Sequence, residues 1–182
     1  TVGMIWAAET QNRTVAEILA CGARYFDLRV ENDGGNLVVF HGPIKGMSFL
    51  PIIDAISEFL TNHPSETLLL DFQHFENDGS MEGVDSLLNE KLNGKLVVND
   101  TEKSDLQFAK GLTVGAARGK AMVFWGNYFK NTSECEYING RNYLFARNND
   151  AGTRTGSTLH SFYKGTLNRL ASKTYLKKAI PE

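Results

Sequence analysis

The segment ETLLLDF, residues 66–72, limits the architecture of this chain more than any other feature. It is a short, nearly continuous apolar run, which is typical of a strand buried on both faces of a parallel sheet. Apolar residues recur with a helical period before it, at residues 49–60, and after it, at residues 84–92. The alternation of helix, strand and helix predicts a parallel sheet that is covered by helices.

The remaining elements follow the same alternation. Thr14 and Glu17 form a capping-box pattern, which predicts a short helix that ends before Gly22. Ser48 is a predicted cap for the helix of residues 49–60. Further strands are predicted at residues 23–30, at LVV from Leu96, at AMVFW from Ala121 and at residues 143–146. The apolar, extended segment LVVF of residues 37–40 leads to His41, and a last helix, interrupted at Gly165, is predicted at residues 157–178.

The length of 182 residues, with 42% apolar and 22% charged residues, is enough to bury a sizeable core as one domain or part of one. Strands and helices in alternation fit either a doubly wound sheet or a barrel. A complete (β/α)₈ barrel typically needs about 250 residues, so 182 residues with four or five recognisable strands are compatible with part of a barrel. No apolar run approaches the roughly 18 residues of a membrane span, and no transmembrane segment is predicted.

The net charge of −2 is unevenly distributed along the chain. The last 32 residues hold six Lys or Arg against one acidic residue, and the first 150 hold thirteen against twenty. A basic segment can attract phosphate or an anionic membrane surface, but a solvated helix face explains the excess as well. Two cysteines, Cys21 and Cys135, are too few for a disulfide scaffold. They are either a pair or two buried thiols, so the compartment stays open.

Asp27 and Arg29 are charged residues inside the apolar strand predicted at residues 23–30. Residues two apart on a strand point the same way, and burying such groups is costly unless they pair or serve a function. His41, at the end of the next extended run, can approach the same point. An acceptor, a fixed cation and a group that titrates near neutral pH suit phosphoryl chemistry. A structural ion pair is the alternative.

The string GARYFDLRV, followed after ENDGGNLVVF by HG, resembles the catalytic core of the phosphatidylinositol-specific phospholipase C X domain. Trp6 and Gln11 resemble the family's W…TQ pattern, FLTNHPSE resembles its FL..NP.E, and RGKAMVFW from Arg118 resembles a later strand. The resemblance covers residues 6 to about 127. It implies a partial TIM barrel with parallel strands, of the PLC-like phosphodiesterase type, in which residues 1–182 form a single, incomplete domain.

The resemblance implies a phosphodiesterase of lipid metabolism that cleaves the bond between phosphate and diacylglycerol through a cyclic inositol phosphate. A first histidine takes the proton of the inositol 2-hydroxyl, an arginine stabilises charge on the phosphate, and a second histidine protonates the departing alkoxide. By motif, Arg29 is the phosphate clamp, His41 is the second histidine and Asp27 orients its neighbours. Three further residues are candidates for substrate or lipid contact, with surface or packing positions as the alternative: Gln73, His74 and Trp125.

The family's first histidine lies in an H-D motif on the strand before W…TQ, and no such motif precedes Trp6. Two interpretations are open: the sequence is a fragment, or it is a phospholipase-like module without its general base. We expect a fragment, inactive and poorly stable alone because a barrel without its first strand has an open sheet edge.

Metal use follows from the same spacing. In animal-type members of the family, a Glu-x-Asp motif stands where this chain has Asp27 and Arg29, and its carboxylates hold Ca²⁺ or Mg²⁺. The same is true of the related glycerophosphodiesterases and sphingomyelinase D-like enzymes. A guanidinium repels a cation, so the chain resembles the bacterial-type, metal-independent subgroup, with no cofactor and no metal ligands.

We expect a phospholipid substrate at a membrane surface, no nucleic acid, a monomer when complete, and secretion or peripheral membrane location, with the cytoplasm left open. The rival functions are a phosphodiesterase of the same barrel class with another headgroup, and a non-catalytic phosphate- or membrane-binding module.

Overall fold

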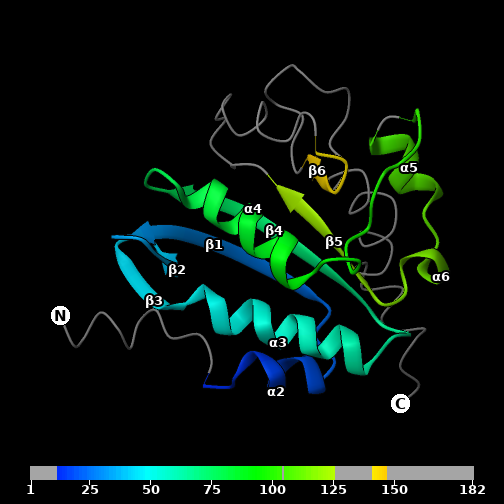
Figure 1. Cartoon of the computed structure of the whole chain (residues 1–182). Coiled ribbons are helices and arrows are strands. Elements are labelled where there is room, and N and C mark those ends of the chain that lie inside the picture. The colour runs from blue at the N-terminus through cyan, green and yellow to red at the C-terminus, as the bar shows by residue number, and fades with distance from the viewer. Residues whose placement is uncertain (1–11, 104, 126–140, 147–182) are drawn as a thin grey trace, which may run out of the picture.

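The computed structural model describes residues 12–103, 105–125 and 141–146 (Figure 1). These residues form a six-stranded sheet in the order β3-β2-β1-β4-β5-β6. The strands are β1 (Tyr25–Asp33), β2 (Asn36–His41), β3 (Ile44–Ser48), β4 (Thr67–Glu76), β5 (Lys120–Trp125) and β6 (Leu144–Ala146). The helices are α2 (Val15–Ala20), α3 (Phe49–Asn62), α4 (Ser80–Lys91), α5 (Asp105–Gly111) and α6 (Val114–Ala117). The helix predicted at residues 157–178 lies outside the described residues.

Four strands, β1, β4, β5 and β6, are parallel, which confirms the predicted α/β class with a parallel sheet. The other two are not. β2 runs antiparallel to β1, and β3 runs antiparallel to β2. Gly34 and Gly35 join β1 to β2 with φ angles of 60° and 98°, and a turn of two such residues reverses the chain into a hairpin. β3 was not predicted, because IKGMS has no alternation of apolar and polar residues.

The strand predicted at Leu96 is reduced to one parallel bridge, between Leu96 and Ala121. Leu96 and Val97 are buried, so the apolar pattern predicted their burial correctly, but it predicted a strand where the structure has a single bridge. Beyond this bridge the Asn99 N–H donates to the Asn142 carbonyl at 2.7 Å, and the Asn99 side-chain oxygen accepts hydrogen bonds from the main chain and hydroxyl of Thr101. Asparagine side chains commonly stabilise turns in this way, and the turn ends the pairing.

Helices α2, α3 and α4 lie on one face of the sheet (Figure 1). Their apolar residues form the first core with one set of alternate strand residues, including Leu28, Val30, Phe72 and Trp125. A smaller second core on the other face contains Met122, Phe124 and Phe145 and contacts residues of α5. β5 contributes to both cores, so this strand is buried on both faces as its apolar sequence predicts.

Helical starts were predicted with mixed success. The Thr14 capping box is confirmed: Thr14 accepts from the Glu17 N–H, and the Glu17 carboxylate accepts from the Thr14 N–H at 2.7 Å. Ser48 is the N-cap residue of α3, as predicted, but its side chain makes no capping hydrogen bond. α3 is held instead by its buried stripe, in which Phe49, Ile53 and Ile56 have no exposed surface.

The capping box has a consequence for titration. Hydrogen bonds from the Thr14 main chain and hydroxyl lower the pKa of the Glu17 carboxyl. A lowered native pKa means that the contribution of Glu17 to stability is present at neutral pH and is lost as the pH falls through that pKa. We expect a ¹³C NMR titration to give a low pKa for Glu17 and a higher one in Thr14→Ala. An unchanged pKa in Thr14→Ala would remove the hydroxyl from this explanation.

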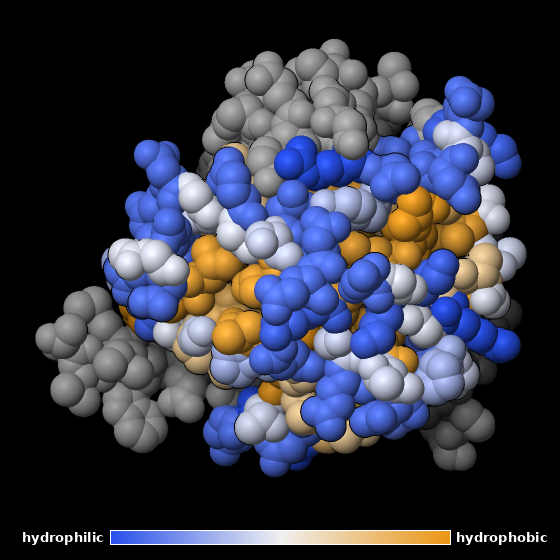
Figure 2. All heavy atoms as spheres, in the orientation of Figure 1, coloured by the Kyte–Doolittle hydropathy of each residue, from blue (hydrophilic) through white to orange (hydrophobic). Residues whose placement is uncertain are grey.

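The outer surface on the helical side is mostly polar, and apolar side chains appear in separate patches (Figure 2). Among the described residues, the large apolar side chains with the most exposure are Met47, Leu50 and Val114. No helix in the described part of the chain has the length and apolar character needed to cross a bilayer.

Candidate functional site

The alternation of β1 places its charged residues opposite the first core. Leu28 and Val30 are buried against the helices, so Tyr25, Asp27 and Arg29 occupy the other face of the sheet. On β4, Leu68, Leu70 and Phe72 belong to the first core, which leaves Asp71 and Gln73 beside the β1 residues. We call this surface, defined by Tyr25, Asp27, Arg29, Asp71 and Gln73, the inner face.

Arg29 contacts two residues on the inner face. Its Nε lies 3.7 Å from Oδ1 of Asp27, and its Nη2 donates to Oε1 of Gln73 at 3.3 Å. The Arg29 side chain is 36% exposed and that of Asp27 41%. The guanidinium is therefore neither buried as an internal ion pair nor free in solvent, and an anion can still reach it.

Asp27, Arg29 and His41 line the same cavity, which has a volume of about 530 Å³. The cavity lies between α2, β1 and the β2–β3 hairpin, and Arg13 contributes a second cation to its lining. His41 is exposed at the last position of β2. The three residues that the sequence assigned to one point therefore border one cavity, which is also bordered by Phe26 and Leu28 from the opposite face of β1. The other residues of the lining are apolar or glycine: Val15, Ile18, Phe26, Leu28, Val39, Phe40, Ile44, Gly46, Met47 and Ile52.

Asp71 belongs to the inner face and was not among the candidates. It pairs in register with Asp27, has no exposed surface and accepts a 2.5 Å hydrogen bond from the Tyr25 hydroxyl. A carboxylate inside the apolar run LLLDF is the same signal that singled out Asp27, since a buried charge needs partners. The signal was present in the sequence, but only Asp27 had a cation two residues away.

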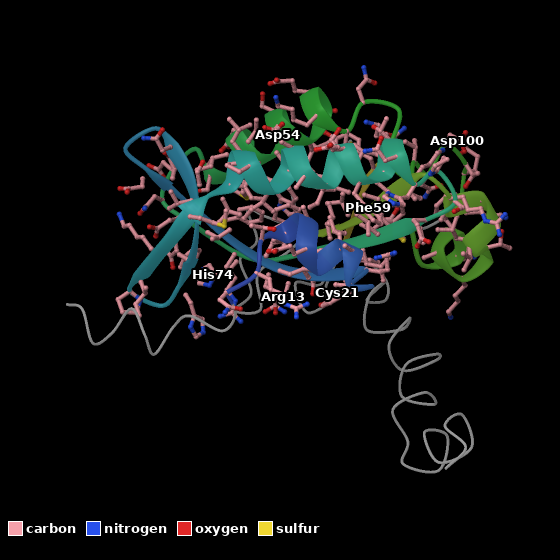
Figure 3. All side chains as sticks on the ribbon, turned by 90° about the horizontal axis from the view of Figure 1, so that it is seen from below. Arg13, Cys21, Asp54, Phe59, His74 and Asp100 are labelled. Atoms are coloured by element: carbon pink, nitrogen blue, oxygen red, sulfur yellow. The ribbon has the colours of Figure 1, made fainter. Side chains whose placement is uncertain are left out.

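Gln73 and His74 lie on β4 beside Arg29. Gln73 touches the guanidinium, as described above. His74 is Arg29's register partner on β4; its Nε2 lies 2.8 Å from Oε1 of Glu76, and its ring meets the Phe40 ring edge-on at 5.3 Å. Figure 3 shows His74 near the end of the sheet at which the β2–β3 hairpin lies. Neither residue is part of the cavity lining among the described residues.

Trp125 was a candidate for lipid contact, and the structure places it in the first core. It has no exposed surface and packs on Phe75 and Phe72 with ring centroids 4.4 Å and 5.4 Å apart. Strand alternation explains this, since Ala121, Val123 and Trp125 share the helical face of β5. Its contribution is packing, the alternative considered for it.

Cys21 is an exposed thiol at the end of α2, beside Arg13 (Figure 3). The suggested partner, Cys135, lies outside the described residues, so their pairing stays a prediction. Within the described ranges, no group of three or more His, Cys, Asp or Glu side chains is arranged to hold a metal ion.

Solved structures with a similar fold are phospholipases. The phosphatidylinositol-specific phospholipase C from Listeria monocytogenes superposes with a TM-score of 0.55 and 27% identity, covering 68% of this chain and 43% of that one. A calcium-dependent phosphoinositol-specific phospholipase C from Pseudomonas sp. gives a TM-score of 0.60 at 16% identity, over 80% and 65% of the two chains. The fold is therefore that of part of a phospholipase C-type TIM barrel.

The sequence comparisons define the family. The profile described as "Phosphatidylinositol-specific phospholipase C, X domain" matches residues 2–126, and the chain belongs to this family. It is 43% identical over 70 residues to human PI-PLC X domain-containing protein 2, covering 36% of this chain and 23% of the relative. It is 32% identical over 71 residues to 1-phosphatidylinositol phosphodiesterase of Listeria monocytogenes, covering 38% and 22%. The chain thus spans less than a quarter of these relatives' length.

Proposed function

We propose that this protein cleaves phosphatidylinositol-type phospholipids at the bond between phosphate and diacylglycerol, without a metal ion. One observation carries the proposal: Asp27, Arg29 and His41 line a single cavity. The names of the relatives support the substrate class, since the Listeria relative is a 1-phosphatidylinositol phosphodiesterase. We also propose that it works at a membrane surface, as a secreted or peripheral protein.

In this proposal Arg29 binds the phosphate group. A guanidinium stays protonated at all relevant pH values and presents a planar fork that matches phosphate oxygens. As the phosphorus gains a fifth oxygen in the transition state, negative charge grows on its other oxygens, and a fixed cation stabilises that charge. Asp27, 3.7 Å from the Arg29 Nε, orients the cation and does not contact the reacting atoms.

His41 is the proposed general acid. The inositol 2-oxygen attacks phosphorus, its bond to phosphorus forms as the bond to the glycerol oxygen breaks, and His41 gives its proton to that departing oxygen. The product is a cyclic inositol phosphate and a free diacylglycerol. The proton of the 2-hydroxyl passes to a general base, which in the family is a histidine on the strand before the W…TQ pattern.

Chelation tests the metal-free part of the proposal. We expect the protein, expressed from its full reading frame, to cleave phosphatidylinositol in vesicles equally well with and without EDTA, because Arg29 supplies the positive charge that a metal would bring. Arg29→Ala in the same preparation should remove most activity in both conditions. Activity that disappears with EDTA and returns with Ca²⁺ would contradict metal independence.

The same vesicles separate catalysis from binding alone. A folded protein that sediments with phosphatidylinositol vesicles but releases no diacylglycerol would argue for a non-catalytic binding module. If Arg29→Ala then abolished the sedimentation, phosphate capture would be its function. Hydrolysis of a different phospholipid in preference to phosphatidylinositol would assign another headgroup to the cavity.

A further inference from the structure

β4 contains a bulge directly opposite the phosphate-binding arginine. Leu28 pairs with Phe72, but the next residue of β1, Arg29, pairs with His74. One step along β1 therefore corresponds to two steps along β4, and Gln73 is the extra residue. Bulges often occur beside functional sites, where they change the direction of a side chain.

The bulge changes which residues reach the inner face. In a regular strand, residues three apart point to opposite faces, yet Phe72 and Phe75 both lie in the first core, with stacked rings 5.8 Å apart. Because of the bulge, the two residues between them, Gln73 and His74, are both directed away from that core. Without the bulge, β4 would present a single residue between these two phenylalanines to Arg29. With the bulge, Gln73 contacts the Arg29 guanidinium, and His74 is the β4 residue that pairs with Arg29.

The chemistry of the contact fixes the orientation of both groups. Arginine carries five N–H donors and no acceptor, so the oxygen of the Gln73 amide must face Arg29. Nη2 of Arg29 donates to Oε1 of Gln73 at 3.3 Å, and Nε of Arg29 lies 3.7 Å from Oδ1 of Asp27. Two contacts at different points of one planar group restrict its rotation. Three of the five N–H groups have no partner among the contacts of the described residues, and the cavity borders the same side chain.

We propose that Gln73 is a positioning residue: the β4 bulge sets its amide oxygen against the Arg29 guanidinium, which is thereby held in the plane needed to receive a phosphate group. The inference rests on the proposed function for the identity of the anion, but the positioning itself concerns only this chain. It assigns Gln73 a role toward Arg29 in place of the substrate contact expected from the sequence.

A neutral amide suits this role better than a charged side chain. A carboxylate at this position would accept the same hydrogen bond but would neutralise the cation, which already has Asp27 nearby. A lysine would repel the guanidinium. Glutamine accepts a hydrogen bond and leaves the positive charge intact for an anion.

The test is made on the full chain with inorganic phosphate as the probe. The ¹⁵N NMR signal of the Arg29 Nε–H, assigned by its absence in Arg29→Lys, reports the order of the guanidinium, and a phosphate titration reports affinity. Gln73→Met keeps the length of the side chain but removes the acceptor. Gln73→Glu keeps the acceptor but adds a charge. The matched control is Gln107→Met, an exposed glutamine on α5.

We expect Gln73→Met to lower the order parameter of the Arg29 Nε–H and to weaken phosphate binding about two- to tenfold, the usual cost of ordering one long side chain. Gln73→Glu should keep the Nε–H ordered while it weakens phosphate binding more. Gln107→Met should change neither quantity. An Arg29 signal and a phosphate affinity that stay unchanged in Gln73→Met would overturn the proposal.

Two further results would also decide between a positioning role and its absence. If the parent binds no phosphate but Gln73→Met still mobilises the Arg29 Nε–H, the positioning role stands and the proposed function fails. If Gln73→Met does not fold, Gln73→Asn replaces it, because its amide is one methylene shorter and cannot keep the 3.3 Å contact. An ordered Arg29 with parent-like phosphate affinity in folded Gln73→Asn would likewise contradict the proposal.

Discussion

Replacing His41 by alanine is expected to lower turnover of phosphatidylinositol by about 10²- to 10⁴-fold, the usual contribution of a general acid, which is the role proposed for this residue. The fold should survive, because His41 is exposed at the end of β2 and belongs to neither core. Circular dichroism and the thermal unfolding midpoint check the fold of the variant, and diacylglycerol release measures the rate.

A second substrate separates the acid role from a structural one. An inositol phosphodiester with an acidic leaving alcohol needs little protonation, so His41→Ala should slow its cleavage far less. Equal losses on both substrates would place His41 among residues that only shape the cavity. Arg29→Ala is the matched comparison, because charge on the phosphate must be stabilised whichever alcohol leaves.

The largest expected effect on stability comes from Trp125. Trp125→Ala should lower the free energy of unfolding by about 3–5 kcal/mol, since it leaves a large cavity among fully packed aromatic rings. Denaturant unfolding measures this loss. Val114→Ala is the control: its side chain is 68% exposed, and such substitutions change stability by about 0.5 kcal/mol or less. A small loss in Trp125→Ala would contradict the packing role and return the side chain to the candidates for lipid contact.

The class of the fold was predictable because its signals are local. The strands at ETLLLDF and AMVFW carry apolar residues in adjacent positions, and only a layer on each face can bury both sets. α3 and α4 were predictable from stripes with a helical period. These features depend on a few neighbouring residues, and each can be read without knowledge of the rest of the chain.

The arrangement of the candidate site was predictable only in part. Asp27 and Arg29 share a face because they are two residues apart, and a charged pair in an apolar strand was visible in the sequence. The bulge at Gln73 was not, because it arises from the pairing of β4 with β1 and from the need to bury both Phe72 and Phe75. The burial of Trp125 also depends on pairing and on the phenylalanines that surround it.

The hairpin also determines where this chain tolerates changes in length. Val30 lies opposite Val39, two residues before His41, and the Gly34–Gly35 turn lies outside that pair. Extra residues in the turn would lengthen a loop and leave the strands aligned. One residue added between Val39 and His41 would move the imidazole to the opposite side of the strand. The turn is therefore the place to insert a reporter or a linker, and the short segment before the histidine has a fixed length.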